Sequence, residues 1–173
     1  MTAKRETKYI DVLLQDWADA RWNTTEFIKG LGDEGLNAKL PRPGLDTFCK
    51  HFQEMIDAEE AYTKAIKRGR VVFDDMGGND DYPGDEGAES LLSRMKKADT
   101  ALQKAARSAL DGTEVDWPGL GPKTVHSLIV NLVSHEMFHV GQLVAFCYAT
   151  GVRLPEALVG SWFLSPQDDS LGS

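Results

Sequence analysis

"HEMFHVGQLVAF", residues 135–146, lies at the centre of the pattern that decides the fold. Apolar residues recur around it at helical spacing from Thr124 to Thr150, and Gly151 follows. Threonine is a good N-cap, and glycine is common just beyond a helix C-terminus. The sequence therefore predicts one long helix here. Within it, His135, Glu136 and His139 spell H-E-x-x-H, a pattern known from zinc proteases.

Three further segments carry the same periodicity, at about residues 9–31, 45–68 and 89–110. Proline and glycine separate the first two, and Gly69 and Gly112 follow the second and third. The one short strand-like run, "RVVF" at 70–73, makes no sheet alone. This arrangement predicts an all-α fold, an up-down four-helix bundle.

The length of 173 residues favours a single domain over residues 1–173. We expect an ordered core from about residue 8 to 164 and a frayed polar tail at 166–173. The loop at 74–87 is acidic and rich in glycine, and it does not match a calcium-binding loop. The apolar segment 154–164 is expected to pack on the bundle or on a second subunit, which favours a homodimer.

The net charge is −8 at pH 7. An acidic surface repels phosphate backbones and anionic lipids, so nucleic acid and membrane are not expected partners. The two cysteines, Cys49 and Cys147, lie in apolar helical patterns. No signal peptide or membrane-spanning run is visible. The sequence predicts a cytoplasmic protein with reduced thiols.

His135 and His139 share one helix face, because four residues turn a helix by about 400°. Asn131 and Gln142 extend this polar strip. Buried imidazoles need partners, and either carboxylates of neighbouring helices or a metal ion would supply them. A pair at this spacing favours the metal, and His51, on the inward face of the second helix, is the expected third ligand. His126, near the helix start, is expected at the surface. Four residues are candidates for lining a pocket: Trp17, Arg21, Trp22 and Tyr62.

Two other readings of these motifs are weaker. A zinc protease packs its H-E-x-x-H helix against a sheet, and no sheet is predicted. A di-iron bundle needs E-x-x-H on two helices. Only Glu136 and His139 supply it, although the second helix offers Glu54, Glu59 and Glu60.

"SHEMFHVGQLVAFCYATGVRLPEAL" (134–158) resembles the last-helix signature of the DinB/YfiT-like family, in which two histidines precede a Gly-Gln-Leu. "TFCKHFQEMIDAEEAYTKAI" (47–66) is similar to that family's second helix, and His51 stands at the position of the family's first histidine. The resemblance extends from about residue 8 to 160. Two positions depart from it: Val140 stands where arginine is frequent, and Asn131 where histidine is common.

The resemblance implies a homodimeric four-helix bundle that holds one divalent metal ion, zinc or nickel, through His51, His135 and His139. It implies a metal-dependent transferase that activates a low-molecular-weight thiol, or a hydrolase that activates water, for attack on a small electrophile. Asn131 and Gln142 are candidates for orienting the ligand. Glu136 is expected to serve packing, a metal-bound histidine or the dimer, and is a candidate proton donor. The alternatives are a non-catalytic metal- or ligand-binding stress-response bundle, a metal-free structural bundle and a zinc hydrolase.

Overall fold

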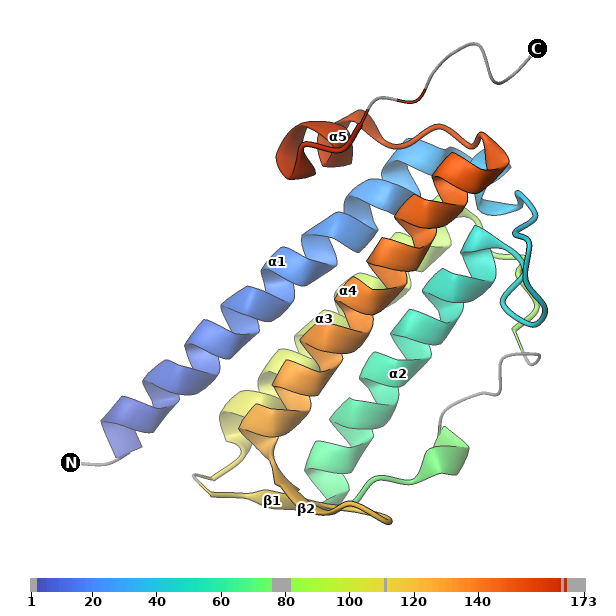
Figure 1. The fold of residues 1–173 in the computed structure, drawn as a ribbon. Coiled ribbons are helices and arrows are strands. Elements are labelled where there is room, and N and C mark those ends of the chain that lie inside the picture. Colours follow the sequence, from blue (N-terminus) through green and yellow to red (C-terminus); the bar gives the residue numbers. More distant parts are fainter. Residues whose placement is uncertain (1–2, 76–81, 111, 166, 168–173) are drawn as a thin grey trace.

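The computed structural model describes residues 3–75, 82–110, 112–165 and 167, with side chains from residue 9 onward. The chain is mostly helical, and four long helices pack side by side (Figure 1). These are α1 (Ala3–Leu36), α2 (Phe48–Arg68), α3 (Ala88–Ser108) and α4 (Val125–Thr150). A short helix, α5 (Glu156–Trp162), lies across one end of the bundle, and a 3-10 turn, η1 (Phe73–Asp75), follows α2.

The helix ends follow the capping signals. The Thr124 side chain accepts from the Ser127 amide at the start of α4, and Thr47 caps α2 in the same way. Gly69 and Gly151 end α2 and α4 in the left-handed conformation that glycine adopts without strain. The predicted bounds of the fourth helix are therefore confirmed to within a residue.

The helices do not simply alternate in direction. The backbone amide of Ala88, at the start of α3, donates to Asp33 Oδ1 near the end of α1 (2.7 Å), whereas Arg107 in its last turn binds Asp11 near the start of α1 (3.0 Å). Helices α2 and α3 therefore run in the same direction, and α1 and α4 run in the opposite one (Figure 1). The alternation expected between the second and third helices was wrong, because α3 begins at the same end of the bundle as α2.

A β-hairpin that the sequence reading missed precedes α4. Strands β1 (Glu114–Trp117) and β2 (Gly121–Thr124) pair antiparallel. The Leu120 amide donates to the Trp117 carbonyl (2.9 Å) across Pro118 and Gly119, and Gly119 has a φ of 83°. Proline followed by glycine is the signature of a type II turn. Part of the "RVVF" run does pair, since Arg70 forms a single bridge with Asp116.

Segment 152–165 folds back over α1. Leu154 and Leu158 are buried, and a Cβ on Gly30 would lie 2.6 Å from Pro155 Cβ. Only glycine therefore permits this close approach. The apolar segment thus packs on its own bundle, which is one of the two arrangements expected from the sequence. Trp162 and Phe163 remain exposed. The predicted tail at 166–173 lies outside the described residues, apart from Gln167.

The core divides into two apolar clusters. One is centred on Phe27, Phe52 and Leu143, and the other on Trp17, Leu102 and Leu128. Polar residues lie between the clusters on every long helix: Arg21 on α1, Glu59 on α2, Asp99 on α3 and Glu136 on α4. Within the described part of the chain, no helix combines the length and apolar character needed to cross a bilayer.

Candidate metal centre

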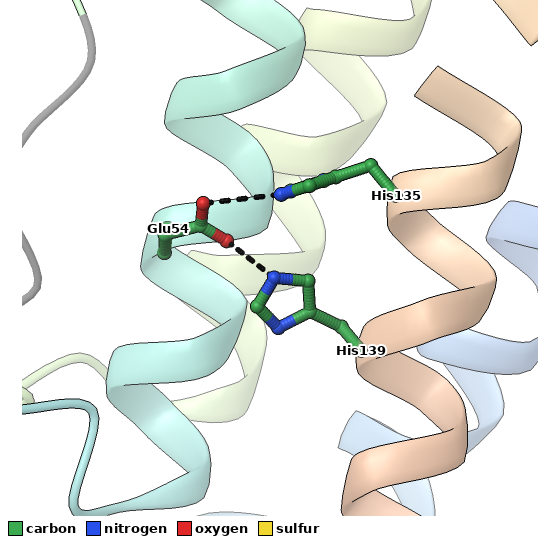
Figure 2. Close-up of side chains that lie close together, drawn as sticks. All are labelled: Glu54, His135 and His139. Carbon is green, nitrogen blue, oxygen red and sulfur yellow. Dashed lines mark hydrogen bonds and ion pairs between the residues drawn. The ribbon is translucent and has the colours of Figure 1, made fainter. Parts of the chain in front are cut away.

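Three side chains that could hold a metal ion meet between α2 and α4 (Figure 2). His135 Nε2 lies 3.2 Å from Glu54 Oε1, and His139 Nε2 lies 3.1 Å from Glu54 Oε2. Ligand atoms of these three residues, one from each, all lie within 4.8 Å of one another. Glu54 and His135 are half-buried and His139 is buried. The triad therefore borders the first apolar cluster and is reached from the surface on the His135 side.

Helix geometry explains this meeting. His135 and His139 are four residues apart, and one face of α4 presents both rings, with centroids 4.6 Å apart. Glu54 lies three residues after His51 on α2, so both point toward α4. The capped starts of α2 and α4 fix the phase of these faces relative to the core.

His51 lies beside the triad. It is fully buried, and its Nδ1 is 3.0 Å from His139 Nδ1. Its ring also contacts Phe146, at a centroid distance of 5.9 Å. His51 thus contacts the nitrogen of His139 that does not face Glu54. The structure brings all three predicted histidines together and adds Glu54. The three-histidine ligand set stays a prediction.

The electrostatics of the triad favour an ionised carboxylate. Burial alone would raise the pKa of Glu54, but hydrogen bonds to His135 and His139 outweigh it and lower that pKa to about 2. Burial opposes the charging of His135, yet its bond to Glu54 prevails and raises its pKa. Burial lowers the pKa of His51 to about 3, with a smaller contribution from the charge of His139. His51 is therefore neutral near pH 7.

The donor set fits a divalent cation. Two imidazoles and a carboxylate form one of the three-ligand sets used at catalytic zinc sites. Two ligands that share a tetrahedral zinc ion lie about 3.3 Å apart, given metal–ligand distances of about 2.0–2.1 Å. The 3.1 and 3.2 Å separations are close to this value. The same contacts also satisfy the simpler alternative, in which both histidines bind a carboxylate of the neighbouring helix.

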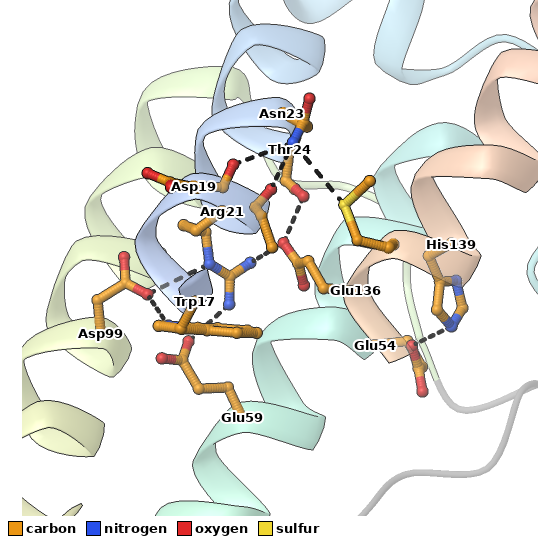
Figure 3. Close-up of polar contacts among 12 residues, drawn as sticks. Trp17, Asp19, Arg21, Asn23, Thr24, Glu54, Glu59, Asp99, Glu136 and His139 are labelled. Atoms are coloured by element: carbon orange, nitrogen blue, oxygen red, sulfur yellow. Dashed lines mark hydrogen bonds and ion pairs between the residues drawn. The ribbon is translucent and has the colours of Figure 1, made fainter. Parts of the chain in front are cut away.

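The three candidate catalytic residues on α4 lie in different environments. Asn131 is exposed, so the polar strip is shorter than expected. Gln142 is half-buried, and its Oε1 is buried without a hydrogen-bond partner among the described residues. Glu136 is fully buried and faces α1, where it binds Arg21 and accepts from the Thr24 hydroxyl. It therefore points away from Glu54 and His139 (Figure 3).

The candidate pocket residues do not surround the triad. Trp17 and Tyr62 are buried in the second apolar cluster, Arg21 is buried in an ion network, and Trp22 is 40% exposed. Cys49 and Cys147 are free and buried, consistent with plain packing roles. Of the acidic loop at 74–87, residues 76–81 lie outside the described residues.

Two surface cavities lie apart from the triad. One of about 170 Å³ borders His126 and the start of α4, and one of about 370 Å³ lies between Ile66 on α2 and Lys104 on α3. Both border residues of the second apolar cluster, and neither is lined by Glu54, His135 or His139.

Sequence reasoning missed the structural setting of two residues. Glu54 was considered only for a di-iron site, although its spacing of three from His51 places both on one helix face. Arg21 was considered a residue that could line the pocket, with an ordinary surface side chain as the alternative. No sequence signal reveals that three carboxylates from three other helices converge on it.

The fold and site together define a class, an all-α helical bundle whose triad can hold a divalent metal ion. Residues 16–143 match the family model of the DinB superfamily, and the chain belongs to that superfamily. This confirms the resemblance drawn from the histidine and Gly-Gln spacing. A search of the curated proteins finds no match to the chain.

Proposed function

We propose that this chain binds one divalent metal ion between α2 and α4 and uses it to activate a low-molecular-weight thiol, or water, for attack on a small electrophile. The observation that carries the proposal is the convergence of Glu54, His135 and His139 within 4.8 Å. Membership of the DinB superfamily supports it. We further propose that the chain is a bundle of the DinB/YfiT type and acts as a homodimer in the cytoplasm.

Glu54, His135 and His139 are the proposed ligands. Zinc and nickel both accept imidazole, and three protein ligands leave a position open. When bound, the cation would supply Lewis-acid chemistry, which favours the ionised form of a thiol or water that reaches it. The carboxylate of Glu54 offsets one unit of the cation's charge. The site is therefore a weaker Lewis acid than the all-imidazole set expected from the sequence.

His51 is proposed to hold the tautomer of His139. If Nε2 of His139 faces the cation, its proton is on Nδ1, and His51 Nδ1 at 3.0 Å is in position to accept it. Burial keeps His51 neutral by lowering its pKa to about 3, so it can act as an acceptor. The three-histidine set, with His51 as a direct ligand, is the alternative arrangement at the same place.

Gln142 is proposed to orient the substrate. Its buried Oε1 has no hydrogen-bond partner among the described residues, and it lies one turn beyond His139 on α4. An unpaired buried carbonyl oxygen is costly, and a donor group on a ligand would satisfy it. Glu136 is unsuited to proton donation at the metal, because its side chain faces α1, where Arg21 and Thr24 both bind Oε1.

A non-catalytic metal-binding bundle is the second candidate. One observation favours it: the two cavities described above lie apart from the triad, among residues of the other apolar cluster. Such a protein would bind metal with the same ligands but without turnover.

The test is a panel of bacterial low-molecular-weight thiols with a chromogenic electrophile, run with zinc-loaded, nickel-loaded and metal-free protein. The proposal predicts turnover with at least one thiol, or hydrolysis in the absence of thiol, that depends on metal. Gln142→Ala should slow turnover while it retains metal, and Asn131→Ala, at an exposed position of the same helix, is its matched control. Equal rates with and without metal would refute the catalytic role, and metal binding without any turnover would favour the second candidate.

A further inference from the structure

A buried ion network lies beside the triad on the α1 side (Figure 3). Its centre is Arg21 of α1, which is 4% exposed. Its Nε donates to Asp99 of α3 (3.2 Å), Nη1 to Glu136 of α4 (2.8 Å) and Nη2 to Glu59 of α2 (2.7 Å). One side chain thus links α1 to each of the other three long helices. A buried charge is retained only when it is paired in this way.

The network lies between the two apolar clusters. On α2, Glu59 lies between Ile56 of one cluster and Tyr62 of the other, and on α4, Glu136 lies between Leu132 and Val140. Arg21 binds both carboxylates, so it links α2 to α4 at this level of the bundle.

Two of the three carboxylates are on the helices that carry the triad. Glu136 directly follows His135, so the two side chains point about 100° apart around α4. When Glu136 is bound to Arg21 and Thr24, His135 is turned toward α2. Glu59 lies five residues after Glu54, which places them about 140° apart around α2. Binding of Glu59 to Arg21 in the same way turns Glu54 toward α4.

We propose that Arg21 is a positioning residue for the metal site: by binding Glu59 and Glu136 together, it fixes the rotation and separation of α2 and α4 so that Glu54 meets His135 and His139. This inference rests on the proposed metal site. Arginine suits the role because its planar fork donates in several fixed directions, whereas a lysine ammonium is a single point charge. The Asp99 contact links α1 to α3 and is not part of the positioning.

The experiment measures the zinc dissociation constant by competition with a chromophoric chelator, on variants shown to be folded by circular dichroism. Arg21→Met removes the charge at similar size. Loss of a group that orients metal ligands typically weakens metal binding by about 10- to 100-fold, and this range is expected. Arg21→Lys should bind with intermediate affinity. Asp99→Asn, which removes the charge that binds Arg21 and Trp17 of α1 to α3, should bind zinc as the wild type does.

Two further variants separate positioning from general stability. Leu102→Ala opens a cavity in the second apolar cluster, lowers Tm and should leave zinc affinity unchanged. Glu136→Gln in the Arg21→Met background removes the carboxylate that lost its partner, and it should recover part of the affinity. A merely structural role for Arg21 would instead make zinc affinity follow Tm in all of these variants.

Wild-type zinc affinity in folded Arg21→Met would overturn the inference while the proposed function stands. Equal losses in Leu102→Ala and Arg21→Met, at equal Tm, would also overturn it. If Arg21→Met does not fold, Arg21→Lys decides, and full affinity there is the contrary result. Failure of the wild-type chain to bind zinc or nickel would refute the proposed function, and this inference with it.

Discussion

His139 of α4 and Glu54 of α2 face each other across the bundle, with Nε2 and Oε2 3.1 Å apart. His135 binds the other oxygen of the same carboxylate at 3.2 Å. One carboxylate thus serves two imidazoles, and a third imidazole, His51, supports the inner one. This relationship makes Glu54 the centre of the site.

The first prediction concerns the ligands. Glu54→Gln and His135→Ala should each lower zinc affinity by at least about tenfold, because the first removes the negative charge of a ligand and the second removes a ligand nitrogen. The matched controls are Glu60→Gln, the same change on the same helix, and His126→Ala, at the start of α4. Both should retain metal by elemental analysis. Full metal content in Glu54→Gln would exclude Glu54 as a ligand.

His51 can be tested separately. His51→Gln keeps an acceptor that can face His139 Nδ1, and the glutamine amide does not titrate in the pH range used. We expect it to retain most of the zinc affinity, whereas His51→Ala, which removes the acceptor, should weaken binding. If the glutamine and alanine variants both lose the metal completely, the three-histidine set is correct.

Metal binding should weaken as the pH falls. The metal needs neutral imidazoles, and Glu54 raises the pKa of His135, so protons compete with the metal from above the ordinary histidine value of about 6.5. Glu54 has a pKa of about 2 and stays ionised throughout. Zinc affinity measured at pH 6, 7 and 8 should rise with each step. A constant affinity over this range would show that the histidines are not ligands.

The buried carboxyl group of Glu59 should make the stability of the fold depend on pH. Burial raises the pKa of Glu59 well above its usual value. A raised folded-state pKa contributes stability that is fully present below the unfolded value of about 4.5 and is lost as pH rises through the folded value. Relative to wild type, Glu59→Gln should therefore become progressively more favourable as pH rises. Urea denaturation at pH 5, 7 and 8.5 in EDTA measures this, and a difference that does not change with pH would contradict it.

The proposed homodimer has a defined surface to test. The buried Leu154 and Leu158 are satisfied within the chain, but Phe138 is 66% exposed on α4 and Phe163 is 94% exposed after α5. Helix α4 carries exposed apolar side chains as well as its buried face, which is expected of a helix covered on both sides. Light scattering should give twice 19.1 kDa for the wild type, and Phe138→Lys should shift it toward the monomer. A wild-type monomer at micromolar concentration would refute the homodimer.

The helices were predictable because local signals decide them. Thr124 begins α4 with a side-chain hydrogen bond, and Gly151 ends it in a left-handed conformation. Neither signal depends on the rest of the fold. The direction of α3 was not predictable from such signals. It depends on contacts between helices, such as that of Ala88 with Asp33, which are visible only in three dimensions. The hairpin did have a local signal, the turn-forming pair Pro118-Gly119, but the helical periodicity on either side does not include it.

The site was predictable in part for the same reason. His135 and His139 belong to one helix, so their spacing alone places them together. Glu54 is on another helix, and its meeting with them depends on the phase of α2 against α4. The Arg21 network depends on all four long helices at once, which no single-sequence period encodes.

The most direct test of the metal site is a crystal structure of the protein grown with zinc, with anomalous scattering measured on both sides of the zinc edge. The proposed metal site should give one strong anomalous peak between α2 and α4, within bonding distance, about 2.0–2.2 Å, of Glu54, His135 and His139. No peak at that place, with both histidines still paired only to Glu54, would contradict it and leave the triad a structural feature of the bundle.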